Sequence, residues 1–241
     1  IVIALFILPF LIVGGMQLFH LEGDDPYEKF LPKFSSIITK ILIIYTILTL
    51  TLFMLYHLNG MTIFDSIAHS FTTISTGGFS THNESFAYFN NSKILFVAII
   101  FMIIGSLPFM LLAQTSWKNI FPFIKDHQVI VFLIILFFAV SLIIFFAFPY
   151  VEGNLIEKYI KISFNTVSII TGTGYVSDNF EQWGNYASVL FLILMFIGGC
   201  AGSTTGGLKI FRFQILFKHI NLHFKRMIQP HAVLVSQFNK K

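Results

Sequence analysis

The chain has 241 residues, of which 56% are hydrophobic and only 11% are charged. Soluble domains usually carry about 25% charged residues, and a mean hydropathy of +0.81 is too apolar for an ordinary water-exposed surface. The net charge of +4 is small, and the single cysteine excludes a disulfide within the chain and a multi-cysteine metal site. The apolar residues form long runs, which indicates a protein embedded in lipid.

Four apolar runs are long enough to cross a hydrocarbon core of about 30 Å, which needs about 20 helical residues. They are residues 1–19, 37–58, 93–115 and 128–149. A fifth run, 185–217, is interrupted near its middle by small residues. The chain opens inside an apolar run without an initiator Met, so we expect a piece of a longer protein and a true spanning helix at 1–19 rather than a signal peptide.

Two shorter apolar stretches, 62–81 and 157–177, lie between spanning runs and are too short and too polar to cross. In the first stretch, apolar residues recur at helical spacing until adjacent glycines favour a break. The segment 72–80 aligns without gaps onto 168–176, an offset of 96 residues, and the flanking spans align as well. The sequence therefore predicts an all-α membrane protein with a repeated unit of helix, short re-entrant helix and helix.

Both short stretches end in a Thr/Gly-rich segment that predicts an ion site. Non-helical backbone at membrane depth is tolerated only within protein or beside water, so two matching breaks indicate one aqueous pathway. Carbonyl oxygens of such a segment can replace an ion's hydration shell, and the C-terminal end of the preceding helix favours a cation. The alternative is a pair of extracellular turns. The predicted filter residues are Ser75, Thr76, Gly77, Gly78, Phe79, Thr171, Gly172, Thr173, Gly174 and Tyr175, with an ion at Thr76, Gly77, Gly172 and Thr173.

No carboxylate lies within either glycine segment. Ca²⁺ and Mg²⁺ usually require carboxylate ligands, so a weakly hydrated monovalent cation fits these segments better. His57, His69 and His82 are not spaced as a metal site, and Asp65 is expected to cap or charge the start of the first short helix.

The interruption of the fifth run predicts a gate. Residues 185–197 predict a half-helix of about 20 Å, and a helix resumes from Leu208. Small residues that face a neighbouring helix would be spaced on one side, whereas these are contiguous and favour a hinge between closed and open forms. The candidate gate consists of Gly198, Gly199, Gly202, Ser203, Thr204, Thr205, Gly206, Gly207 and Lys209.

The charges predict the orientation in the membrane. Acidic residues Glu84, Glu152, Asp178 and Glu181 lie in the segments that carry the short stretches, whereas every charged residue after Gly207 is basic. The positive-inside rule therefore places the C-terminal segment in the cytoplasm. Lys209 and Arg212 are expected to be snorkelling anchors, with gate closure as an alternative role for Lys209. A nucleic-acid-binding arm is the less favoured reading of this basic segment.

Other chemistries fit less well. Gly202–Gly207 lacks the Gly-Lys-Ser/Thr ending of a phosphate-binding loop, so we expect no organic cofactor on this chain. A membrane-embedded enzyme would need clustered acids, histidines or cysteines at facing helix ends, which the sequence does not predict. In a non-conducting scaffold the two filter-like loops would have no purpose.

Several motifs resemble the TrkH/TrkG potassium-uptake proteins of the Trk/Ktr/HKT superfamily. Segments 69–82 and 166–175 resemble the second and third pore loops of that family, and 196–209 is the closest match. Residues 14–19 and 229–233 match as well. The resemblance implies repeated helix–pore-helix–helix units around a pseudo-symmetric pore, with 198–207 as an intramembrane loop that obstructs the pore below the filter.

The same resemblance implies the division of the chain. Residues 1–36 would end the first repeat with a spanning helix at 1–19 and a cytoplasmic loop. Residues 37–115 would form the second repeat and 116–217 the third, while 218–241 would be a basic cytoplasmic connector to a fourth repeat.

The function implied is potassium uptake across the bacterial inner membrane, driven by the membrane potential. The family usually forms homodimers and binds a TrkA-like cytoplasmic nucleotide-binding regulatory subunit. The third loop reads Thr-Gly-Thr-Gly-Tyr where the family more often has Thr-Ala-Gly-Phe. This departure leaves sodium or another monovalent cation, such as ammonium, as the alternative cargo.

Overall fold

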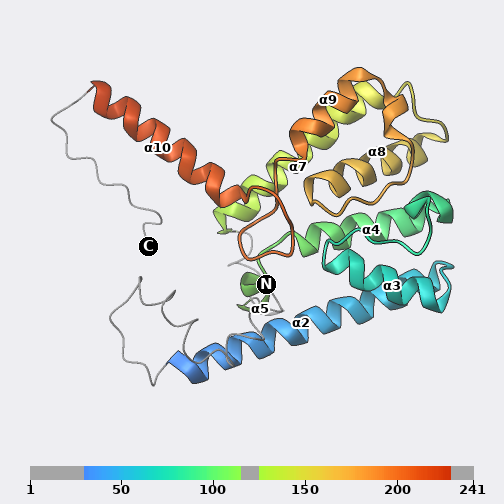
Figure 1. Ribbon diagram of the computed structural model, residues 1–241, viewed down its shortest axis with the longest axis horizontal. Helices are drawn as coiled ribbons and strands as arrows, with labels where there is room; N and C mark the ends of the chain where they lie inside the picture. Colours follow the sequence, from blue (N-terminus) through green and yellow to red (C-terminus); the bar gives the residue numbers. More distant parts are fainter. Residues whose placement is uncertain (1–29, 115–124, 229–241) are drawn as a thin grey trace.

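The computed structural model describes residues 30–114 and 125–228, which are helical apart from loops and one isolated bridge between Ile197 and Leu208 (Figure 1). The predicted spanning helix 1–19 and the C-terminal residues 229–241 lie outside the described residues. The elements are α2 (Phe30–Leu58), α3 (Ile63–Ile74), η2 (Ser85–Phe89), α4 (Ser92–Gly105), α5 (Phe109–Gln114), α7 (His127–Ala147), α8 (Leu155–Ile170), η3 (Phe180–Trp183), α9 (Asn185–Leu194) and α10 (Ile210–Ile228).

Two described helices are long and apolar enough to cross a membrane. They are Thr39–Leu58 within α2, with a mean hydropathy of 2.1, and α7, with a mean hydropathy of 3.4. Only 22% of the most apolar window of each helix is buried inside the protein, so most of their apolar side chains face outward, which is the pattern expected of lipid contact. Both helices lie where the sequence predicts spans 37–58 and 128–149.

The apolar run 93–115 is not one continuous helix, as its prediction as a single spanning run implied. Helix α4 ends at Gly105, α5 begins at Phe109, and Ser106-Leu107-Pro108 between them is not helical. Pro108 has no N–H to donate into a continuing helix and its ring crowds the preceding turn. The half-helix predicted at 185–197 is also shorter than expected, and α9 ends at Leu194.

The helices form two similar units, one of α2, α3 and α4 and the other of α7, α8 and α9 (Figure 1). In each unit the short middle helix packs against the long helix before it and against the helix after it. Helix α4 also packs against α8 of the other unit. This contact places the loops that follow α3 and α8 beside each other.

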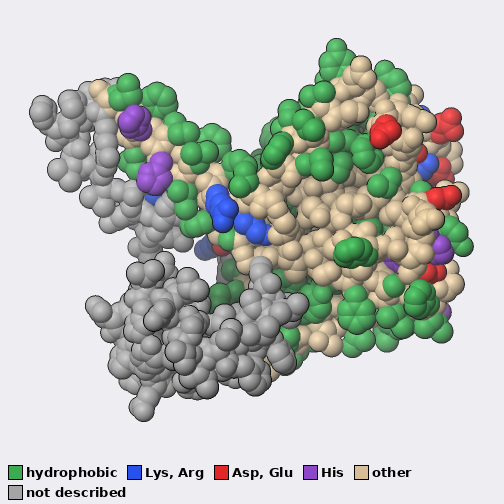
Figure 2. Space-filling view, viewed as in Figure 1, with side chains coloured by type: hydrophobic (Ala, Val, Ile, Leu, Met, Phe, Trp, Pro, Cys, Tyr) green, Lys and Arg blue, Asp and Glu red, His purple; other side chains and the backbone are tan. Residues whose placement is uncertain are grey.

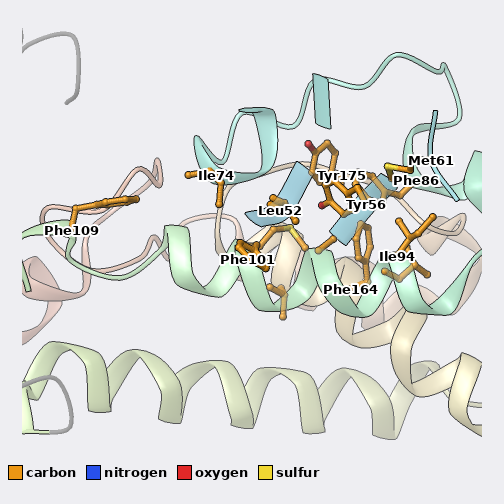
Figure 3. Packing of buried hydrophobic residues seen from close by; sticks show 14 of the residues in the cluster. Leu52, Tyr56, Met61, Ile74, Phe86, Ile94, Phe101, Phe109, Phe164 and Tyr175 are labelled. Atoms are coloured by element: carbon orange, nitrogen blue, oxygen red, sulfur yellow. The ribbon is translucent and has the colours of Figure 1, made fainter. Parts of the chain in front are cut away.

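Aromatic residues from both units form the core at this junction (Figure 3). Phe86 is buried with its ring centroid 4.4 Å from that of Tyr175, 5.2 Å from that of Phe164 and 6.0 Å from that of Tyr56. Leu52 of α2 is also fully buried in this cluster. Large rings packed at these distances hold the two units in one arrangement.

The first short helix is polar on its buried side and apolar on its exposed side. The buried residues of α3 include Asp65, Ser66, His69, Ser70 and Thr73, whereas Phe64 and Phe71 are exposed. A helix of a water-soluble protein has the opposite arrangement. The arrangement of α3 therefore indicates apolar surroundings outside and a polar interior, as expected for a helix within a membrane protein.

The surface view agrees with this picture. Hydrophobic side chains lie over much of the face shown in Figure 2, including α2, α9 and α10. The acidic side chains gather at the end formed by the loops around α3, α8 and α9, with some basic side chains among them, and further Lys and Arg side chains lie near the start of α10 (Figure 2). The two ends of the protein therefore differ in charge, as the sequence predicts.

Candidate ion pathway

The loops after α3 and α8 have the same backbone structure. Each short helix closes into its loop through three backbone hydrogen bonds, and these bonds recur at the offset of 96 residues. Ser75, Thr76 and Gly77 donate to the carbonyls of Phe71, Thr73 and Thr72, and Thr171, Gly172 and Thr173 donate to those of Val167, Ile169 and Ser168.

Left-handed backbone angles also recur in the two loops. Thr76 has a φ of 49° and its counterpart Gly172 a φ of 66°, while Gly78 and its counterpart Gly174 have φ values of 71° and 84°. Glycine adopts this region without the steric penalty of a side chain. Thr76 does carry a side chain, and its hydroxyl donates to the carbonyl of Ser75 at 2.7 Å, a local bond that helps to hold this conformation.

The two loops touch each other directly. A Cβ atom built on Gly78 would lie 1.7 Å from the carbonyl oxygen of Thr173, so only glycine allows this approach. The hydroxyl of Tyr175 lies 2.5 Å from Thr72 Oγ1 and 3.1 Å from Thr73 Oγ1 of α3. The structure thus brings together the two segments that the sequence pairs as a filter.

The two aromatic residues that follow the glycines differ in their surroundings. Tyr175 is buried beneath α3, and its carbonyl accepts a hydrogen bond from Ser168 Oγ at 2.8 Å. Its counterpart Phe79 is 77% exposed. The hydrogen bond from Ser168 helps to hold the second loop in place, and the part of Tyr175 in the filter stays a prediction.

The chemistry of the two loops suits a monovalent cation. Their side chains carry the hydroxyls of Ser75, Thr76, Thr171, Thr173 and Tyr175 and no carboxylate, and their backbone carbonyls are the other oxygen groups. Among the described residues, no group of three His, Cys, Asp or Glu side chains could hold a metal ion. The ion position at Thr76, Gly77, Gly172 and Thr173 stays a prediction.

Residues 198–207 form a compact loop between α9 and α10. Its two ends are joined because Gly198 N donates to the carbonyl of Leu208 at 2.9 Å and Leu208 N donates to that of Phe196 at 3.2 Å. A Cβ on Gly198 would lie 2.3 Å from the carbonyl oxygen of Gly206, so the ends require glycine.

Lys209 is not a snorkelling anchor as expected. Its Nζ donates to the carbonyl of Thr205, to Thr205 Oγ1 at 2.9 Å and to Ser203 Oγ at 3.3 Å. The ammonium group therefore binds oxygens within the loop, where they offset the loss of water around the charge. The part of Lys209 in the candidate gate, the alternative to an anchor, stays a prediction.

The 198–207 loop occupies the break between α4 and α5, which sequence reasoning missed. Cys200 N donates to the carbonyl of Ser106 at 3.0 Å, Thr204 N to that of Gly105 at 3.1 Å, and Phe109 N to that of Gly202 at 3.1 Å. The backbone groups freed by the break are thus satisfied by the loop. Pro108 was the signal in the sequence that could have revealed the break. At the repeat offset of 96 residues, Ser106 also corresponds to Gly202 of the Gly-rich loop.

A second group of residues holds the outer end of the first loop, and the sequence did not predict that its members interact. The Asp65 carboxylate accepts hydrogen bonds from Thr62 Oγ1 at 2.8 Å and Thr81 Oγ1 at 2.6 Å, and His82 Nε2 lies 3.3 Å from it. Thr62 is the N-cap of α3, so Asp65 charges the first turn rather than capping it. His69 Nε2 lies 2.9 Å from Ser80 Oγ, which fixes the chain leaving the glycines.

These features define a helical membrane protein with two repeated units of helix, short helix and helix and a Gly-rich loop packed between them. The whole chain, residues 1–241, matches the family described as TrkH, cation transport protein. The chain therefore belongs to the TrkH cation transport family.

Curated relatives are similar over all or nearly all of this chain. The Trk system potassium uptake protein TrkI of Halomonas elongata is 37% identical over 243 residues, which cover 100% of this chain and 49% of TrkI. TrkH of Escherichia coli (strain K12) is 37% identical over 242 residues, which cover 97% of this chain and 49% of that protein. The chain spans about half the length of the curated relatives it matches.

A solved structure is similar as well. The crystal structure of the potassium transporter TrkH from Vibrio parahaemolyticus superimposes with a TM-score of 0.80 at 31% sequence identity. The match covers 98% of this chain and 48% of that one. The all-α membrane transporter fold expected from the sequence is therefore confirmed.

Proposed function

We propose that this chain forms the central part of a pore for potassium uptake. The observation that carries this proposal is the direct contact between the two glycine loops, in which the carbonyl oxygen of Thr173 lies where a side chain of Gly78 would be. A dehydrated monovalent cation would be held by oxygens of these loops. The membrane potential, worth about 2.3 kcal/mol per charge at 100 mV, would drive it inward.

The division of the chain into repeats belongs to the same proposal. Residues 1–36 would end the first repeat, 37–115 would form the second and 116–217 the third, and 218–241 would connect to a fourth. The contrast between Phe79 and Tyr175 supports this arrangement. Tyr175 packs against α3, the short helix of the repeat before it, so the exposed ring of Phe79 is suited to the short helix of a first repeat.

The 198–207 loop would act as the gate of this pore. It lies next to the third-repeat filter, because a Cβ on Gly172 would be 3.6 Å from the nitrogen of Gly206. We further propose a homodimer in the bacterial inner membrane, with the C-terminal segment in the cytoplasm and a TrkA-like regulatory subunit bound there. Most of the 116–127 loop, a candidate contact for that subunit, lies outside the described residues.

Flux measurements on the complete reading frame that encodes this chain would test the proposed cargo. The protein should restore growth at low potassium to a bacterial strain without its own uptake systems, and it should carry potassium into proteoliposomes under a negative inside potential. Equal fluxes of sodium and potassium would show that the protein carries monovalent cations in general rather than potassium in particular. A folded, reconstituted protein that carries neither ion would contradict the proposal.

A further inference from the structure

Thr204 lies where the 198–207 loop, the end of α3 and the end of α4 meet. Its Oγ1 is 3.0 Å from the carbonyl oxygen of Ile74 and 2.9 Å from that of Gly105. It is also 3.3 Å from Thr76 Oγ1 in the first glycine loop. One side chain of the candidate gate therefore contacts the predicted filter directly.

The surrounding backbone is shaped to admit this hydroxyl. A Cβ on Gly105 would lie 3.0 Å from the carbonyl oxygen of Ile74 and 3.4 Å from Thr204 Oγ1, so a larger residue would push the three segments apart. The carbonyls of Ile74 and Gly105 are at the C-terminal ends of α3 and α4, where helices leave carbonyls without intrahelical partners. The Gly105 carbonyl already accepts from Thr204 N, so the Thr204 hydroxyl matters most as a donor to the Ile74 carbonyl.

Thr204 lies between Ser203 and Thr205, and Lys209 holds both of these neighbours. Ser203 and Thr205 both bind the ammonium of Lys209, and their hydroxyl oxygens lie 2.8 Å apart. Residues 203–205, the tip of the loop, are therefore expected to move together. Displacing that tip must separate Thr204 from Ile74.

We propose that Thr204 is a positioning residue that ties the 198–207 loop to the filter of the second repeat. The loop cannot leave the break between α4 and α5 without removing the donor from the Ile74 carbonyl, which lies two residues before Thr76. Loop position and filter geometry are thereby coupled, and by reciprocity an ion in the filter holds the loop in its seat. This inference rests on the proposed function in treating residues 75–79 as a filter.

Cys200 provides a reporter of the loop position. It is fully buried, it lies in the loop, and it is the single cysteine of the chain. In the complete protein, with any cysteine outside this chain replaced, Thr204→Val should make Cys200 react about fivefold faster or more with a membrane-permeant maleimide. Thr204→Ser keeps the hydroxyl and should react at nearly the wild-type rate.

Thr51→Val is the matched control, because the Thr51 hydroxyl also binds a backbone carbonyl, that of Ile47, but on an exposed part of α2. Its Cys200 rate should equal that of the wild type. A wild-type rate in Thr204→Val would overturn the inference, as would an equal acceleration in Thr51→Val.

The wild-type protein offers a measurement that needs no folded variant. Saturating potassium should slow Cys200 labelling relative to choline, and equal rates in the two salts would overturn the coupling. The proposed function fails separately: if no potassium flux is found while Thr204→Val still accelerates labelling, the tie between loop and α3 stands and the cargo is wrong.

Discussion

At the scale of single residues, glycine is required where two backbones approach and where φ is positive. Gly78 meets both conditions, because its φ is 71° and the carbonyl of Thr173 occupies the space of a side chain. Gly174 meets one, because its φ is 84° but a Cβ there would meet nothing within 4 Å. Substitutions at Gly78 and Gly174 therefore distinguish the effect of a steric clash from the effect of backbone strain alone.

Gly174→Ala should retain more potassium flux than Gly78→Ala. A left-handed Ala costs about 1–2 kcal/mol at either position, but Gly78→Ala must also move the backbone of the neighbouring loop. Flux per reconstituted protein, measured side by side in proteoliposomes, checks the order. Equal flux through the two variants would show that the contact between the loops is not needed for transport.

Asp65 gives the outer end of the first loop a pH dependence. Burial alone would raise the pKa of this carboxyl, but the hydrogen bonds from Thr81 and Thr62 and the neighbouring His82 lower the pKa below its ordinary value. A carboxyl whose pKa is lower in the folded state stabilises that state above its unfolded pKa of about 3.9. This contribution is lost as the pH falls through the lower, folded value.

Asp65→Asn should therefore lower the thermal unfolding temperature in detergent at pH 7. The expected loss is about 1–3 kcal/mol, because the amide replaces a buried charged acceptor of two hydroxyls. Wild type and variant should keep the same separation from pH 5 to pH 8 and converge towards pH 3. A separation that is unchanged at pH 3 would rule out this origin.

At the scale of elements, the break after α4 is as important as the loop that fills it. Gly105 ends α4 with Ile74 of α3 on one side and Thr204 of the loop on the other. The break gives up a continuous helix, and the loop supplies the hydrogen bonds that the helix would have made. The two interrupted helices therefore depend on each other.

Gly105→Val should destabilise this junction, because its side chain would enter a space bounded by Ile74, Thr76 and Thr204. Overpacking of this kind typically costs about 1–3 kcal/mol. Thermal unfolding in detergent measures the loss, and Ile100→Val on the exposed side of α4 is the control. Loss of stability in the control alone would show that the junction is loosely packed.

At the scale of the whole molecule, the charges at the two ends fix a prediction of topology. Glu84 lies in the segment that also carries the loop after α3, and Lys225 lies in the last turns of α10. The positive-inside rule places Lys225 in the cytoplasm and Glu84 outside.

Cysteines introduced one at a time as Glu84→Cys and Lys225→Cys, in a background without Cys200, should differ in labelling of intact cells. A membrane-impermeant maleimide should label the first and spare the second until the membrane is permeabilised. The reverse pattern would invert the proposed orientation and the direction of uptake.

The sequence by itself determined much of this protein. The apolar runs at 37–58 and 128–149 predicted helices that the structure contains, because about 20 apolar residues in succession have few other solutions. The repeat at an offset of 96 residues predicted two equivalent glycine loops, and the structure repeats even their hydrogen bonds. Local composition and internal repetition are properties of the chain alone, so they can be read without coordinates.

Only the tertiary structure decided how these parts meet. The break at Ser106–Pro108, the burial of Tyr175 and the tie from Thr204 to Ile74 all depend on partners about a hundred residues away or more. The inward position of Lys209 depends on Ser203 and Thr205, which are near in sequence but come within reach only because the loop folds back. An apolar run that could span alone gives no sign that another segment will occupy its place. A lysine snorkels or turns inward according to which oxygens the fold brings within reach of its ammonium group.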